Sequence, residues 1–233
     1  MNKQNNIIRK IYREKDIEKI EKKINMLGSK VKFDATTFMN TRIITTIIVF
    51  VIVLYRVELG YIFAPLFSIL YYYLYYYLLI TRPLNTRIKK LDREALYFFD
   101  ILTLTLESGR NLENSLEVTV SNVDSELSRE FEKTLSEMQF GKTMIEALES
   151  MKTRIPSETI NNIVLNITQT SIFGNSILET MYNQIDFLRE KQILEIRGEI
   201  NKIPNKISII SVVFIVPLIL MMILGPFLIN FFQ

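Results

Sequence analysis

Charged residues are absent from three long stretches of the chain, and these stretches are rich in aliphatic and aromatic side chains. No charge occurs over residues 43–55, 62–80 or 207–233. The second and third stretches hold 19 and 27 residues, enough to cross a hydrocarbon core of about 30 Å as helices. The first reaches that length over residues 38–59 if the arginines near its ends extend into the headgroups. The pattern predicts an all-α integral membrane protein with about three transmembrane helices.

Between Arg82 and Lys206 the apolar positions follow a helical period, and we find no strand alternation. Three glycines recur at intervals of 32 and 33 residues, each followed two positions later by a good helix N-cap: Gly109 with Asn111, Gly141 with Thr143, and Gly174 with Ser176. Such phrases predict helix–turn–helix corners. The corners separate about six helices, expected over residues 84–107, 112–121, 125–139, 144–153, 157–172 and 177–202, in a cytoplasmic antiparallel bundle.

Lysine and arginine are distributed unevenly around the apolar stretches. Residues 1–42 carry 11 of them, the turn near Arg56 carries one, residues 82–206 carry 16, and the rest of the chain carries none. The positive-inside rule therefore predicts a multi-pass protein of the cell (cytoplasmic) membrane, with the N-terminus and the bundle in the cytoplasm. The expected parts are a charged amphipathic arm (1–37), a transmembrane helical hairpin (38–81), the cytoplasmic bundle (82–206) and a C-terminal transmembrane helix (207–233).

The arm places five apolar residues at heptad-like spacing: Ile17, Ile20, Ile24, Leu27 and Val31. This face could pair with a partner helix or lie on the inner leaflet, and a solvated arm with one apolar face is the simplest alternative. The second apolar stretch contains "YYYLYYYL" from Tyr71. Six tyrosines are more than an interfacial aromatic belt would account for, so we expect some of them to bond other helices.

Composition limits the chemistry that the chain can perform. It contains no cysteine and no histidine, which excludes disulfides, cysteine metal sites and the commonest general base. Asp100 and Glu107 share a helix face, but we interpret them as contacts to a neighbouring helix or partner rather than as an acid–base pair. "FGKT" at Phe140 lacks the first glycine of a phosphate-binding loop. We expect no catalytic residues, no cofactor, no metal and no nucleic-acid partner.

The last apolar stretch contains Pro217 and the pair Gly225–Pro226. Proline removes a backbone donor from a helix, so a kink is expected. No charged residue lies inside any of the three spans to mark an ion path, which argues against a transporter or channel.

Taken together, several phrases resemble the type II secretion system F domain, the inner-membrane platform component of type II secretion and type IV pilus machines. They are "DILTLTLESGRNLENSL" from Asp100, "LSEMQFGKTMIEAL" from Leu135, "SIFGNSILETM" from Ser171, "QIDFLREKQILEIRGEINKIP" from Gln184 and "FIVPLILMMILGP" from Phe214. With a single F domain, the chain is most similar to the tight-adherence (Tad) pilus branch.

The resemblance implies a scaffold and not an enzyme. It implies docking of a hexameric assembly ATPase on the bundle, steering of pilin or pseudopilin subunits by the spans, and homo- or hetero-oligomers with a paralogous platform membrane protein. Position near the corners, together with the resemblance, selects the expected partner-binding residues: Asp100, Glu107, Glu137, Glu146, Glu179 and Arg189. The expected structural turns are at Gly109, Gly141, Gly174, Pro217, Gly225 and Pro226.

Two other functions remain open from the residues alone. A membrane-anchored adaptor or signalling protein would recruit a cytoplasmic effector through the same arm and bundle. A membrane enzyme would have to rely on carboxylate chemistry, and it is the least favoured of the three.

Overall fold

The structure is a computed structural model that describes residues 14–28, 33–173 and 176–231. The chain divides into two units, residues 1–184 and 185–233, and each is described by itself. The described residues form helices and no strand, as predicted. Three helical stretches are long and apolar enough to cross a membrane: Ala35–Arg56, Gly60–Glu107 and Ile177–Leu224.

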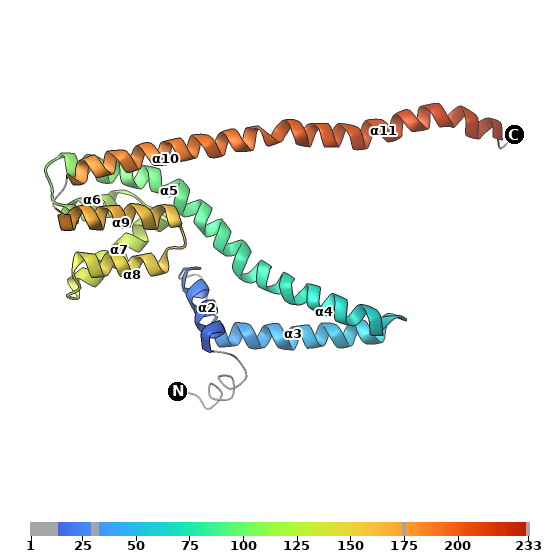
Figure 1. Ribbon diagram of the computed structural model, residues 1–233, viewed down its shortest axis with the longest axis horizontal. Helices are drawn as coiled ribbons and strands as arrows, with labels where there is room; N and C mark the ends of the chain where they lie inside the picture. The colour runs from blue at the N-terminus through green and yellow to red at the C-terminus, as the bar shows by residue number, and fades with distance from the viewer. Residues whose placement is uncertain (1–13, 29–32, 174–175, 232–233) are drawn as a thin grey trace. The chain divides into compact units, whose positions relative to one another are not determined.

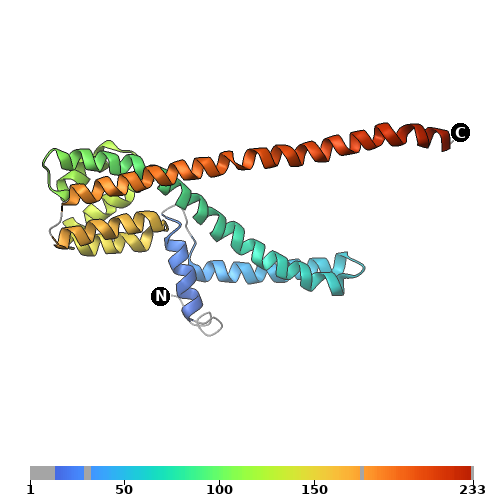
Figure 2. The same ribbon diagram turned by 45° about the horizontal axis from the view of Figure 1, so that its top comes forward.

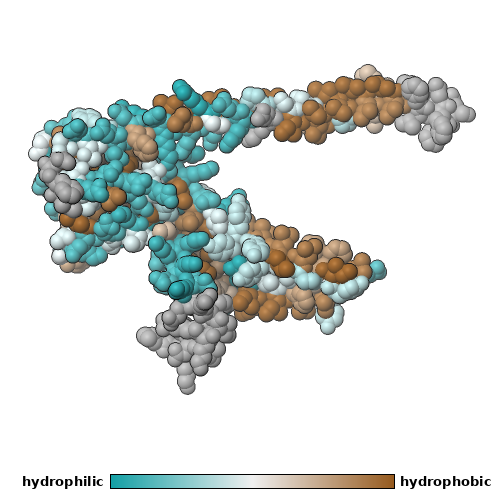
Figure 3. All heavy atoms as spheres, viewed as in Figure 1, coloured by the Kyte–Doolittle hydropathy of each residue, from teal (hydrophilic) through white to brown (hydrophobic). Residues whose placement is uncertain are grey.

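The first unit contains an apolar helical hairpin. Helix α3 (Ala35–Arg56) and helix α4 (Gly60–Tyr76) lie side by side in both ribbon views (Figures 1 and 2). Their outer surfaces are aliphatic and aromatic (Figure 3). Thr45 and Thr46 donate their hydroxyl protons to the carbonyls of Thr41 and Arg42, at 2.7 and 2.6 Å. These two hydroxyl groups are thereby satisfied inside the helix, as a lipid environment requires.

The hairpin continues into the bundle without a loop. Helix α4 passes into a π-helical turn, η1 (Tyr77–Thr81), and then into α5 (Arg82–Glu107). The amide of Arg82 donates to the carbonyl of Tyr77, five residues earlier. Pro83 follows directly and has no amide proton to donate, which gives a local reason for the shifted register. The predicted border between hairpin and bundle at residues 81 and 82 thus falls inside one continuous helical path.

The bundle follows the predicted helix order closely. Helices α6 (Leu112–Asn122), α7 (Glu126–Gln139), α8 (Met144–Arg154) and α9 (Glu158–Phe173) follow α5, and α10 (Ile177–Ile200) begins after them. Three buried rings form the centre of the core, with the Phe98 and Phe131 centroids 4.6 Å apart and stacked, and Phe99 edge-on to both. Burial of such large side chains is the main favourable contribution to folding of the bundle.

Two of the predicted corners are described, and both have the expected geometry. Gly109 and Gly141 have φ angles of +84° and +100°. Asn111 and Thr143 cap the helices that follow, and Thr143 forms a complete capping box with Glu146. The third glycine, Gly174, lies outside the described residues, but the amide of Glu179 donates to the Ser176 hydroxyl at 3.4 Å beyond it.

The arm packs against its own chain. Its helix α2 (Glu14–Asn25) places Ile24 in a cluster with Phe38 and Met39 of α3 and Ile80 of η1, and Ile17 and Ile20 pack against that cluster. Helix α2 is therefore not a free solvated helix. Val31, the last residue of the expected heptad face, lies outside the described residues.

The second unit consists of the later part of α10 and of α11 (Lys202–Phe231). Helix α11 continues through Pro217 and through Gly225–Pro226. Large apolar side chains are exposed along α11 as far as Leu224 (Figure 3). Such a helix suits the interior of a bilayer.

We predict that Gly109→Ala lowers the free energy of unfolding by about 1 kcal/mol, because a Cβ atom is disfavoured at positive φ. No atom lies within 4 Å of the added carbon, so backbone strain is the only cost. Urea unfolding of the detergent-solubilised protein, followed by circular dichroism, would measure the change. Gly109→Asn should lose less, since asparagine tolerates this conformation. An equal loss for both variants would contradict the left-handed turn.

Candidate functional site

A buried arginine connects the arm, α5, α7 and α8. Arg87 of α5 has a side chain only 6% exposed. Its Nε donates to Glu126 at 2.7 Å, and its Nη2 donates to Glu130 at 2.9 Å. Its Nη1 donates to the carbonyls of Met26 and Arg154, at 2.5 and 3.0 Å. One guanidinium group on α5 therefore binds two carboxylates and two carbonyls on three other segments.

Both carbonyl partners of Arg87 lie at the ends of helices. Arg154 is the last residue of α8, and Met26 follows the last residue of α2. Carbonyl groups at a helix C-terminus have no partner within their own helix and form the negative end of its dipole. A cation at this point satisfies both termini at once.

The contacts continue from Glu130, whose side chain is 4% exposed. It also accepts hydrogen bonds from Lys133 at 3.2 Å and from Arg154 Nε at 3.3 Å. Arg154 Nη1 donates to Glu137 at 2.5 Å, and the other oxygen of Glu137 accepts from Lys142. We call this set the ion-pair chain: Arg87, Glu126, Glu130, Lys133, Arg154, Glu137 and Lys142.

Helical spacing explains why α7 can supply the carboxylates. Glu126, Glu130 and Glu137 are separated by four and seven residues, so they project from one face of α7. Arg87 is followed at intervals of four residues by Leu91 and Ala95, which are buried on the same face of α5. Sequence reasoning did not select Arg87, but an arginine on the apolar face of a helix was a signal that could have found it.

A glycine lets the arm approach this arginine. Gly28, just after α2, has a φ angle of +82°, and a Cβ atom added there would lie 3.0 Å from Arg87 Cζ. Both the backbone conformation and the space therefore favour glycine at this contact.

Two carboxyl groups of the ion-pair chain have lowered pKa values. Burial raises the pKa of Glu126, but hydrogen bonds from Arg87 and Lys90 and their charges outweigh burial and hold it below the ordinary 4.5. Burial likewise opposes ionisation of Glu137, whereas hydrogen bonds from Lys142 and Ser150 and the charges of Arg154 and Lys142 lower its pKa. Both groups are ionised at neutral pH, which suits a structural connection rather than proton transfer.

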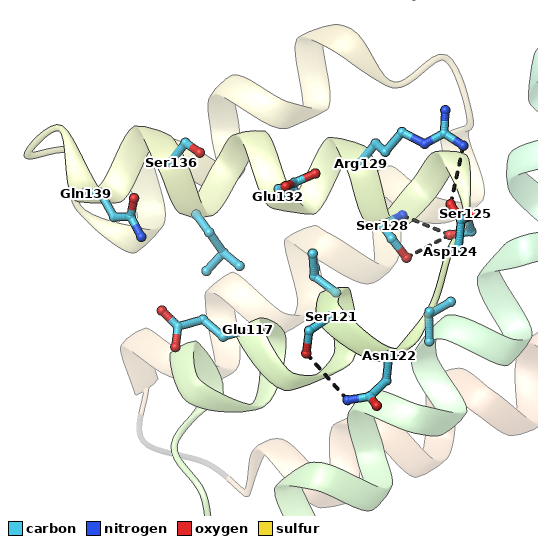
Figure 4. A pocket seen from close by; sticks show the side chains of 13 residues that line it. Glu117, Ser121, Asn122, Asp124, Ser125, Ser128, Arg129, Glu132, Ser136 and Gln139 are labelled. Carbon is cyan, nitrogen blue, oxygen red and sulfur yellow. Dashed lines mark hydrogen bonds and ion pairs between the residues drawn. The ribbon is translucent and has the colours of Figure 1, made fainter.

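A polar groove of about 610 Å³ lies between α6 and α7 (Figure 4). Its lining includes the linker that joins the two helices and the first turn of α7, where the Ser125 and Ser128 hydroxyls lie 2.9 Å apart and Ser125 caps α7. Arg129 and Asp124 form an exposed ion pair at 3.5 Å. Within the described ranges no group of three acidic side chains is placed to hold a metal ion. The groove offers a polar contact surface, in which Ser125 and Ser128 already bond each other at the start of α7.

The structure places the six predicted partner-binding residues in different settings. Glu137 belongs to the ion-pair chain, and Glu146 is the exposed partner in the capping box of α8. Its pKa is lowered by the backbone amide and hydroxyl of Thr143. Glu107 accepts a hydrogen bond from the Tyr182 hydroxyl.

The other three predicted residues are Asp100, Glu179 and Arg189. Asp100 is half-buried on α5, and Glu179 is exposed in the first turn of α10. Arg189 lies further along α10, with its Nη1 3.9 Å from Asp186 Oδ1. Partner binding by these six residues stays a prediction.

The central part of the chain matches the model of a known protein family. Residues 98–225, more than half of it, match the family model of type II secretion system (T2SS), protein F. The chain belongs to the T2SS protein F family. Proteins of the T2SS protein F family are membrane platform proteins of type II secretion and type IV pilus machines. The matched region begins at the buried rings of α5 and ends in α11. No curated protein and no solved structure matched the chain.

We predict that Glu130→Gln destabilises the T2SS protein F domain by about 3–5 kcal/mol, because the buried Arg87 and the partly buried Arg154 lose their shared counter-charge. Lys133→Gln is the matched control: its side chain is 48% exposed, so its removal should change stability by less than about 1 kcal/mol. Urea unfolding in detergent would measure both. Equal effects would show that Glu130 acts as an ordinary surface ion pair.

The lowered pKa values predict an acid-sensitive stability. Because the folded pKa values of Glu126 and Glu137 lie below the ordinary 4.5, their contribution is complete above that value and is lost as pH falls through the lowered values. Unfolding midpoints measured from about pH 6 to about pH 3 should therefore fall more steeply in the wild type than in Glu126→Gln/Glu137→Gln. Parallel curves would contradict the assignment.

Proposed function

We propose that this protein is the inner-membrane platform of a Tad-like type IV pilus or a type II secretion machine, and that it couples a cytoplasmic hexameric ATPase to assembly of pilin or pseudopilin subunits. The observation that carries the proposal is the family match over residues 98–225, which includes most of the bundle and continues into the last apolar helix. A platform needs both a polar docking domain and helices in the membrane, and the chain provides the two together.

The proposed topology places the N-terminus and the bundle in the cytoplasm, with the hairpin turn on the other side. The numbers of lysine and arginine support this orientation, since 27 of the 28 lie outside the hairpin turn, 11 of them in residues 1–42 and 16 in residues 82–206. The proposed parts are the arm (1–37), the transmembrane hairpin (38–81), the cytoplasmic bundle (82–206) and the C-terminal transmembrane helix (207–233).

The path from bundle to hairpin supports a mechanical role. Because α4, η1 and α5 form one helical path, a displacement of the bundle is transmitted to the hairpin without a flexible loop. Arg87 binds α7 and the end of α2 near the start of α5. Energy released by a partner ATPase would reach the membrane through these contacts, and the chain itself would need no catalytic group.

The corners of the bundle are the proposed docking surface for the ATPase. Glu107, Glu146 and Glu179 are exposed acidic residues next to the three corners. Exposed acidic residues suit recognition of a basic surface, because they steer association and set specificity. Glu137 is less accessible to a partner, since Arg154 and Lys142 already bind it.

The test is affinity capture of the tagged full-length protein from its host in mild detergent, with mass spectrometry of the bound proteins. We expect a hexameric secretion ATPase and a second, similar membrane protein. Glu107→Lys/Glu179→Lys should lower the amount of ATPase captured about tenfold or more, because reversed charges repel the partner. Glu146 is left unchanged in this variant so that the capping box survives.

The matched control is Glu190→Lys/Glu195→Lys, which reverses two exposed charges on α10 away from the corners. It should capture the ATPase like the wild type. Equal capture by both variants would exclude the corners as the docking surface. Capture of a different soluble effector, with no ATPase, would favour the membrane-anchored adaptor.

A further inference from the structure

Basic and aromatic side chains surround a second hollow, where α2 meets the beginning of α3 and the end of α4. This hollow has a volume of about 560 Å³, and its polar lining consists mainly of Lys19, Lys22, Lys23, Arg42, Tyr72 and Tyr76. Asp16 is the one acidic residue in the lining, so four cations face a single anion. The cations around Glu130 share several carboxylates, whereas these four share one among the residues that line the same hollow.

Arg42 is held in place by an aromatic side chain and a backbone carbonyl. Its Cζ lies 3.4 Å from the centroid of the Tyr72 ring, and its Nε donates to the Tyr72 carbonyl at 3.1 Å. In the described part of the chain, neither Nη atom of Arg42 has a hydrogen-bond partner. An arginine fixed in this way presents two donors in a plane, the arrangement that matches the oxygens of a phosphate.

The lysines of α2 complete the basic wall. Lys19, Lys22 and Lys23 are exposed and project from neighbouring positions of one helix face. Lys23 Nζ donates to the Tyr76 hydroxyl at 2.7 Å, which ties the arm to α4. Lys19 and Lys22 have no ion-pair partner among the residues that the structure describes. Like charges so close together favour binding of an anion between them.

The hollow lies at the border between polar and apolar surface. Arg42 is two turns into α3, and exposed aliphatic side chains begin directly beyond it with Ile44, Ile47 and Ile48. Figure 3 shows the hydrophilic surface of the arm beside the apolar surface of the hairpin. A ligand bound here would therefore meet cations at one end and a continuous apolar surface at the other.

We propose that this hollow binds the phosphate headgroup of an anionic phospholipid, with its acyl chains along α3 and α4. Arg42 contacts the phosphate oxygens, and Lys19 and Lys22 supply the remaining positive charge. The apolar surface beyond Arg42 selects a lipid over a free phosphate ion. The bound lipid also stabilises the arm against the hairpin, because the cations come from both.

Native mass spectrometry of the full-length protein in mild detergent tests the proposal. Phosphatidylglycerol, added in steps, should form adducts at lower concentration than phosphatidylcholine. Lys19→Gln/Lys22→Gln should weaken phosphatidylglycerol binding by about fivefold for each lysine, the size typical of basic residues near an anionic membrane surface. Arg42→Lys should also weaken binding, since it keeps the charge but removes the planar pair of donors.

The matched control Lys15→Gln/Lys89→Gln removes two exposed charges that do not line the hollow, and it should bind like the wild type. Circular dichroism of each variant checks that the helices remain intact. Equal weakening by both double variants, or equal binding of the two lipids, would overturn the site. Displacement of the lipid by millimolar inorganic phosphate would assign the hollow to a free anion instead.

Discussion

The burial of Arg87 constrains the polar part of this protein more than any other single interaction. A buried guanidinium group is tolerated only if its charge and its donors are satisfied, and no single helix here could satisfy them. Glu126 and Glu130 come from α7, one carbonyl comes from the end of α8, and another comes from the residue after α2. Displacing any one of these segments leaves Arg87 or a carboxylate without its partner. The four segments are therefore held in one arrangement, although apolar packing supplies most of the folding free energy.

The position of this arginine along α5 gives the constraint a mechanical meaning. Arg87 lies less than two turns after η1, where the helix leaves the hairpin and enters the bundle. A π-helical turn is a point at which a helix can change register. Contacts to α2, α7 and α8 directly beyond it oppose independent bending of the two parts. In a platform protein, this is where movement of a docked partner would have to pass to reach the membrane.

Local features of the fold could be predicted from the sequence, and long-range ones could not. The helix borders and the corners at Gly109 and Gly141 depend on glycines and caps only a few residues apart, and Thr143 was expected as an N-cap from its spacing alone. Arg87, in contrast, contacts residues 39, 43, 61 and 67 positions away, and no periodicity indicates which partners a folded chain will bring to it. The same limit affects the site: Glu137, selected for its nearness to a corner, has two internal cations as partners.

The cations around Glu130 and those around Arg42 differ in whether their charge is used within the fold or is available to a ligand. Around Glu130 the cations and carboxylates are matched, and the central groups are buried, so their free energy of interaction stabilises the fold. Around Arg42 the cations exceed the carboxylates, and the guanidinium is oriented by a tyrosine and a carbonyl that neutralise none of its charge. Excess charge of one sign raises the free energy of the folded chain unless an outside anion compensates it. At the polar border of an apolar hairpin, the phospholipid headgroup is the anion that is always present.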